Sequence, residues 1–146
     1  MKPRSKSVWM TPAACGAHAL HDGYTDLVYV MLPIWQGEFG LGFAALGLMR
    51  TVFSGTLAGF QIPASFVAER FGAATVLALG TALAGFGYIF AGFSSGVAGL
   101  VAALFIGGLG ASTQHPLASS LIAHAFAGDR SLKALVLTIS PVTSGK

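Results

Sequence analysis

The chain has 146 residues, of which 54% are hydrophobic and only 9% are charged. Soluble domains carry about a quarter charged residues, so this composition excludes an ordinary soluble domain and indicates an integral membrane protein. The net charge of +3 is small and dispersed, which argues against nucleic-acid binding, and the single cysteine excludes a disulfide within the chain.

Four long apolar stretches predict transmembrane helices, because each reaches the roughly 20 residues that a bilayer requires. They lie within residues 13–126, and their approximate bounds are 13–34, 42–66, 73–93 and 99–123. The fold class expected is therefore all-α, with short loops that make successive helices antiparallel neighbours. Residues 1–12 are expected to form a cytoplasmic N-terminus. Residues 127–146 are expected to form a cytoplasmic loop and the incomplete beginning of a fifth helix.

Basic residues are distributed unevenly among the loops. Lys2, Arg4 and Lys6 precede the first predicted helix and Arg70 lies between the second and third, whereas the loops after the first and third helices carry no basic residue. The positive-inside rule then places the N-terminus in the cytoplasm. Trp35 is expected to anchor the outer end of the first helix at the membrane interface.

The first predicted helix carries a polar stripe. Five residues recur at spacings of three and four and therefore share one helix face: His18, Asp22, Thr25, Asp26 and Tyr29. A charged residue in mid-membrane costs roughly 2.5–3.5 kcal/mol, so this face should point to a bundle interior or a water-filled cavity. A structural ion pair is the alternative, but the convergence of several polar groups favours a proton or substrate site.

Depth along the predicted helices indicates two polar layers. At 1.5 Å per residue, Asp26 and Arg50 reach the same level outside the membrane midplane, which predicts that they form an ion pair. The inner layer takes one residue from each of three helices: His18, Gln61 and His115. Asp22 lies between the layers, and burial favours a neutral carboxyl group, so Asp22 is the strongest candidate for reversible protonation.

Proline and glycine mark special positions in two predicted helices. Pro63 and Pro116 predict kinks, and the alternatives are hinges or carbonyl groups freed to line a cavity. The segment GGLGAS, residues 107–112, has small side chains that predict close helix packing. The third predicted helix has few polar side chains and is expected to be peripheral and to face lipid.

Four segments in order resemble the major facilitator superfamily, and within it the fosmidomycin-resistance branch of bacterial efflux proteins. They are AHALHDGY (17–24), LPIWQGEFGL (32–41), FQIPASFVAERFG (60–72) and GGLGASTQHP (107–116). The third segment resembles the superfamily's conformational loop motif, whose acid, base and turn correspond to Glu69, Arg70 and Gly72. The sequence departs from the motif at four positions: Ser65 replaces its glycine, Glu69 replaces its aspartate, and Ala73 and Ala74 replace its two basic residues. These departures predict a weaker conformational latch.

The resemblance implies a secondary active transporter, not an enzyme, that works without a cofactor as a proton-coupled antiporter for small-molecule or drug efflux. It implies a multi-pass protein of the cell (inner) membrane whose partners are membrane lipid and, in the intact parent, small-molecule substrate and protons. Asp22 would carry the proton, Asp26 and Arg50 would form a charge pair that breaks between states, and His18 and His115 would relay protons.

The superfamily has twelve helices in two halves. The chain is therefore interpreted as a truncated or frameshifted N-terminal fragment that lacks the C-terminal half, and it is expected to be inactive alone. One alternative is a self-sufficient four-helix exporter that works as a dimer with Asp22 as a shared proton site. A second alternative is a haem-binding membrane redox protein with His18 and His115 as axial ligands.

Overall fold

The computed structural model describes residues 6–125, with side chains described at positions 16, 22, 23 and 25–121. Within these residues the protein is built of helices joined by short turns, and the described part contains no strand. The helices are α1 (Lys6–Phe39), α2 (Phe43–Gly59), α3 (Gln61–Phe71), α4 (Ala73–Gly92), α5 (Val97–Ala111) and α6 (Gln114–Ala125). The expected all-α class is confirmed for this part of the chain, whereas the predicted loop at 127–146 lies outside the described residues.

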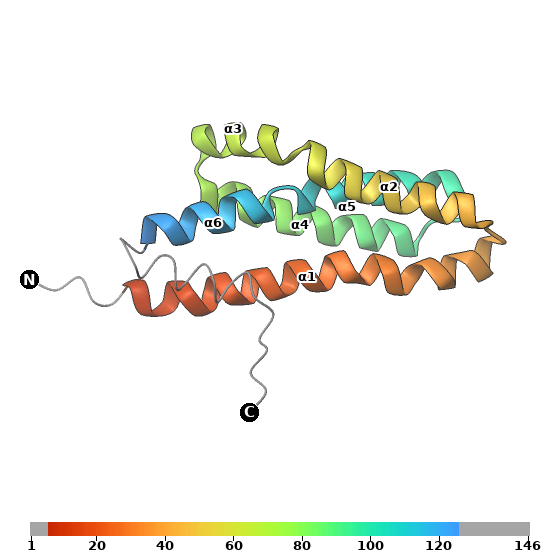
Figure 1. Cartoon of the computed structure of the whole chain (residues 1–146), viewed down its shortest axis with the longest axis horizontal. Coiled ribbons are helices and arrows are strands. Elements are labelled where there is room, and N and C mark those ends of the chain that lie inside the picture. The colour runs from red at the N-terminus through yellow and green to blue at the C-terminus, as the bar shows by residue number, and fades with distance from the viewer. Residues whose placement is uncertain (1–5, 126–146) are drawn as a thin grey trace, which may run out of the picture.

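α1 is one uninterrupted helix of 34 residues, about 50 Å long at 1.5 Å per residue. It runs along one side of the bundle, the bent pair α2–α3 runs along the other side, and α4, α5 and α6 lie between them (Figure 1). The helix ends at Phe39 and is followed by Gly40, whose φ of 61° lies in the left-handed region that glycine adopts without strain. The amide of Leu41 then donates to the carbonyl of Gln36 at 3.0 Å, which closes the helix end.

The second predicted membrane helix is broken. α2 and α3 are bent by 43° relative to each other, with Phe60 between them. Pro63 is the third residue of α3 and has no N–H to donate to the carbonyl of Gly59, so it interrupts the hydrogen-bond ladder one turn before its own position. The kink predicted at Pro63 is thus a break into two helices.

The fourth predicted membrane helix is interrupted in a similar way. α5 ends at Ala111 and α6 begins at Gln114, with Pro116 again as the third residue of the second helix. The tripeptide Gln-x-Pro therefore begins both α3 and α6, and in both places it follows a break. Unlike α2–α3, this interruption leaves residues Val97–Leu121 as one continuous candidate membrane span.

Glycines bring α4, α5 and α2 into close contact. A Cβ atom on Gly87 of α4 would lie 2.6 Å from the Cα of Gly107 on α5, and one on Gly108 would lie 2.6 Å from the carbonyl oxygen of Phe53 on α2. No side chain larger than hydrogen fits at such distances. The close packing predicted for residues 107–112 is confirmed, and α4 and α5 form the most extensive helix pair of the described part.

The apolar core joins α1, α2 and α5. Met49 and Phe53 of α2 pack with Leu100 and Leu104 of α5, and all four are buried. Trp35 of α1 belongs to the same cluster and is only 3% exposed. Its predicted role as an interfacial anchor is therefore wrong, because its indole completes the core instead of lying at the surface.

Fewer membrane spans are identified than the sequence predicts. Among the described residues, Ala73–Gly92 and Val97–Leu121 are long and apolar enough to cross a bilayer, and α2–α3 adds a third if the bent pair counts as one span. α1 is not among them, because aspartates and histidines interrupt its apolar sequence. α4 buries one stripe against α5 and exposes large apolar side chains on its other side, as expected of a peripheral helix.

Candidate functional site

The polar stripe of α1 lies on the outer surface of the described bundle. Asp22, Asp26 and Tyr29 are exposed, while Val28 and Trp35 are buried in the core. At 3.6 residues per turn, the buried pair lies roughly opposite Asp26 around the helix axis. The side chains share a face as predicted. This face does not point into the interior of the described bundle, because the opposite, apolar face of α1 packs against the other helices.

Arg50 of α2 meets the stripe at Tyr29. Its guanidinium carbon lies 5.0 Å from the centre of the Tyr29 ring, within the range of a cation–π contact. Met49, its neighbour in the chain, is fully buried, whereas Arg50 is exposed, so Arg50 projects from α2 away from the core. The contact places a positive charge beside the acidic face of α1.

The predicted ion pair between Asp26 and Arg50 is not formed. Within the described part of the chain, Asp26 makes no ion pair, and Arg50 contacts the tyrosine instead. Tyr29 lies three residues beyond Asp26 and therefore about 4.5 Å farther along α1. The side chain of Arg50 thus reaches α1 at Tyr29 and not at Asp26, although the two helices do meet through this arginine.

The predicted inner layer is only partly described. Gln61 is half-buried at the first position of α3, and its backbone carbonyl accepts a hydrogen bond of 3.1 Å from the Ser65 hydroxyl. His115 is exposed at the second position of α6. The backbone of His18 lies in α1, but its side chain is outside the described residues, so the proton relay and the haem alternative, which both require it, stay predictions.

A buried polar group that the sequence did not single out lies next to His115. Gln114 is only 2% exposed, and its amide nitrogen donates to the hydroxyl of Thr81 on α4. Among the described residues its amide oxygen has no hydrogen-bond partner. The repeated Gln-x-Pro pattern was the signal available in the sequence, since it marks Gln114 as the counterpart of Gln61.

The loop motif between α3 and α4 has its turn but no internal ion pair. Gly72 has a φ of 89°, its amide donates to the carbonyl of Ala68 at 2.8 Å, and its own carbonyl accepts from Val76 at 3.1 Å. Glu69 and Arg70 are exposed, and in the described part of the chain neither forms an ion pair. Glycine is required here because other residues adopt this φ only with strain.

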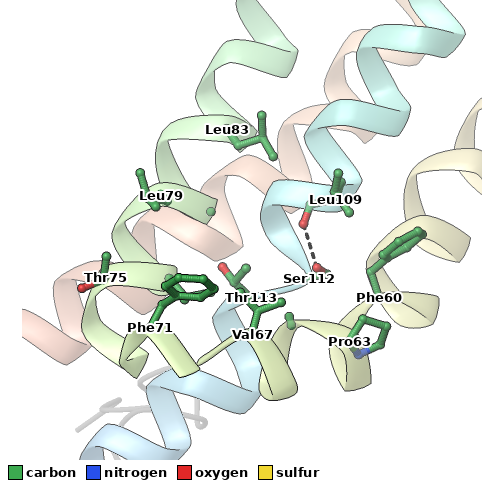
Figure 2. Close-up of a pocket in the computed structure, with 13 residues that line it drawn as sticks. Phe60, Pro63, Val67, Phe71, Thr75, Leu79, Leu83, Leu109, Ser112 and Thr113 are labelled. Atoms are coloured by element: carbon green, nitrogen blue, oxygen red, sulfur yellow. Dashed lines mark hydrogen bonds between the residues drawn. The ribbon is translucent and has the colours of Figure 1, made fainter. Parts of the chain in front are cut away.

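A cavity of about 470 Å³ lies between α3, α4 and the junction of α5 with α6. Figure 2 shows Phe60 and Pro63 on one side, Leu79 and Leu83 of α4 on the other, and Ser112 and Thr113 at the junction. Both helix breaks therefore border the same cavity. Its lining residues include none of the α1 stripe, so the cavity and the stripe are separate features.

The comparison with protein families decides the identity. The model of the Major Facilitator Superfamily matches residues 14–143, which is most of the chain. The chain belongs to this superfamily. No curated protein and no solved structure gave a match. Members of the superfamily are transporters and not enzymes, so the apolar helices of this major facilitator protein belong to a membrane transport fold.

Membership in a transport family directs attention to the ionisable residues of α1 and α2. Ionisable residues within membrane segments of transporters mark ion and substrate pathways by default. The described ionisable residues near this part of α1 and α2 are Asp22, Asp26 and Arg50, and Arg50 contacts α1 at Tyr29, on the face that carries the two aspartates. This region is the candidate functional site.

Proposed function

We propose that the protein belongs to the fosmidomycin-resistance-like branch and takes part in proton-coupled export of a small molecule across the inner cell membrane, with its N-terminus in the cytoplasm. The observation that carries this proposal is the exposed polar stripe of α1 with Arg50 beside it. The four sequence segments that resemble this branch support it as well.

The energetic argument concerns the surroundings of the stripe. A charged side chain that faced lipid near mid-membrane would cost roughly 2.5–3.5 kcal/mol. Asp22, Asp26 and Arg50 are all exposed on the described bundle, so their face must be covered by water or by polar protein surface. A water-filled pathway with α1 as one wall satisfies this requirement.

Each residue then has a distinct role. Asp22 carries the proton, because it lies closest to the middle of the predicted first span. Arg50 makes a cation–π contact with Tyr29 in this conformation. When the transporter changes state, it breaks this contact and forms an ion pair with Asp26, about one helical turn away. His18 and His115 are proposed as the proton relay at the inner end of the pathway, since α6, which carries His115, packs on α1. Gln61 lies on α3, across the bundle from α1 (Figure 1), and is not assigned to this pathway.

The opposite wall of the pathway must come from elsewhere. Because the stripe lies on the outer surface of the described helices, these helices alone do not enclose a route for substrate. We propose that further helices close the pathway and that the chain does not transport by itself. The alternative is a second copy facing the first across the stripe, as in a dimeric exporter.

Cysteine accessibility tests the pathway. In a Cys15→Ser background, Asp26→Cys should react with a charged, membrane-impermeant thiol reagent at least about tenfold faster than the exposed but lipid-facing control Phe86→Cys, because hydrocarbon suppresses the reactive thiolate. The protein is assayed in membrane vesicles opened to the reagent on both sides. Equal, slow reaction of the two variants would show that the stripe meets lipid and would exclude an aqueous pathway.

A second assay distinguishes the two ways to close the pathway and tests proton coupling. Inverted vesicles that contain only the 146-residue chain should keep an imposed pH gradient when a panel of small toxic compounds is added. A compound that collapses the gradient, with the effect lost in Asp22→Asn, would favour the dimeric exporter.

Infrared difference spectra recorded on acidification should show a protonated carboxyl band that disappears in Asp22→Asn.

A further inference from the structure

The cavity beside α3 and α4 is open to the surroundings of the bundle. Three of the apolar side chains that line it are largely exposed: Val67, Phe71 and Leu79. Along α4 it extends from Thr75 to Leu83, a distance of about 12 Å at 1.5 Å per residue. The cavity is therefore an open groove whose length and apolar lining suit an extended hydrocarbon chain.

Arg70 does not line the groove itself but lies next to Phe71, a residue of its wall. The guanidinium of Arg70 is 6.0 Å from the centre of the Phe71 ring, which forms part of the groove wall. Among the described residues Arg70 forms no ion pair. The hydroxyl of Thr75 belongs to the same end of the groove, as Figure 2 shows beside Phe71.

The neighbouring acid does not neutralise this charge. Glu69 lines a separate pocket between α3 and α6, together with Ser65 and Ser120. Successive residues of a helix point about 100° apart, so the carboxylate and the guanidinium leave α3 on different sides. The guanidinium of Arg70 is therefore not paired with Glu69, and its contact with Phe71 places it beside the groove wall.

From this juxtaposition we propose that the groove binds one anionic phospholipid of the surrounding membrane. Its phosphate contacts Arg70, and one acyl chain lies along Phe71, Leu79 and Leu83. Arginine suits this role because its planar guanidinium binds phosphate oxygens in pairs. Arg70 also lies where the chain turns from α3 into α4, the level at which a membrane-spanning chain reaches the lipid headgroups.

The groove is deep enough for a bound lipid to reach both helix breaks. Its far end is bordered by Phe60 and by Ser112 and Thr113, which lie at the two helix breaks. A bound acyl chain therefore contacts both broken helices at once. Such a chain would hold α3 against α4 and the junction of α5 with α6, and it would raise the thermal stability of the protein.

Native mass spectrometry of the purified 146-residue protein measures this binding. With phosphatidylglycerol and phosphatidylcholine present in equal amounts, we expect the anionic lipid to dominate the first bound adduct. Arg70→Gln should lower this preference about fivefold, since one basic residue near an anionic lipid surface contributes about 1 kcal/mol. Arg70→Lys should keep most of the preference, and the melting temperature should rise with phosphatidylglycerol only when position 70 is basic.

Three controls make the outcome decisive. Arg50→Gln removes the same charge far from the groove and should leave the lipid preference unchanged, whereas Val67→Trp fills the groove and should weaken binding of both lipids. Glycerol phosphate, which has no acyl chain, should not displace the lipid. The proposal is overturned if Arg70→Gln keeps the full preference, if Arg50→Gln lowers it equally, or if glycerol phosphate competes as well as the lipid does.

Discussion

Single side chains decide how closely the helices of this protein approach one another. Gly87 and Gly108 lie where backbone atoms of a neighbouring helix come within 2.6 Å of the position that a Cβ would occupy. Gly55 of α2 lies in an equally regular helix but has no atom within 4 Å of that position. Glycine is therefore required for close helix contact at positions 87 and 108. At position 55 no contact requires it, and it only lowers the stability of the helix.

This difference predicts opposite effects of one substitution. Gly87→Ala should destabilise the protein by about 1–3 kcal/mol, because a methyl group there forces α4 and α5 apart. Gly55→Ala is the matched control and should be neutral or stabilise by about 0.5–1 kcal/mol, because alanine favours the helix. Thermal unfolding of both variants in detergent, followed by circular dichroism, gives the comparison. Equal melting temperatures for the two variants would contradict the packing described for α4 and α5.

At the scale of the elements, two helices share one construction. α3 and α6 both begin with Gln-x-Pro after a break, and both breaks border the same groove. Proline at the third position removes one hydrogen bond to the preceding turn, so each break has a local cause in the sequence. The bend is 43° for α2–α3, and α3 also packs on α4 and α6, so proline and packing are both candidate causes of its size.

Removing the proline should straighten the bent pair. Two straight segments of the lengths of α2 and α3 that meet at 43° span about 3 Å less than one continuous helix. In Pro63→Ala we expect the distance between spin labels at positions 43 and 71 to increase by up to about 3 Å, measured by double electron–electron resonance. Pro33→Ala, in the uninterrupted α1, should leave this distance unchanged. An unchanged distance in Pro63→Ala would assign the bend to packing alone.

At the scale of the whole molecule, the turns fall at two ends of the bundle. The turns at Gly40 and Ser95 lie at one end, and the turn at Gly72 lies at the other, as the antiparallel course of α1 to α5 requires (Figure 1). Arg70 is next to the turn at Gly72, whereas the other two turns carry no basic residue. This asymmetry predicts which end faces the cytoplasm.

Sidedness of labelling checks that orientation. In a Cys15→Ser background, Ser95→Cys should react with an impermeant thiol reagent added to intact cells. Glu69→Cys should react only after the cells are opened, because the positive-inside rule places the end with Arg70 in the cytoplasm. The reverse pattern would invert the protein in the membrane. It would also move the proposed lipid to the other leaflet without removing its binding site.

Much of the candidate site follows from local spacing. Asp22, Asp26 and Tyr29 share a face because an α-helix repeats every 3.6 residues, and this holds wherever the helix packs. The same spacing cannot tell which way the face points. Burial of Val28 and Trp35 rotates α1 so that the acidic face lies outside the described bundle, and that rotation depends on side chains of α2 and α5, far away in the sequence.

The sequence by itself determined the all-α class, the membership in a membrane transport family, the common face of the polar stripe and the close packing of residues 107–112. These depend on composition and on spacings within one helix. Only the tertiary structure decided that Arg50 meets Tyr29, that Trp35 is buried, that Gln114 reaches Thr81 and that Arg70 lies beside the wall of an apolar groove. The physical reason is that each of these features depends on how a helix is rotated and how deeply it is packed, or on where a turn places its side chains. Contacts between residues far apart in the sequence set both.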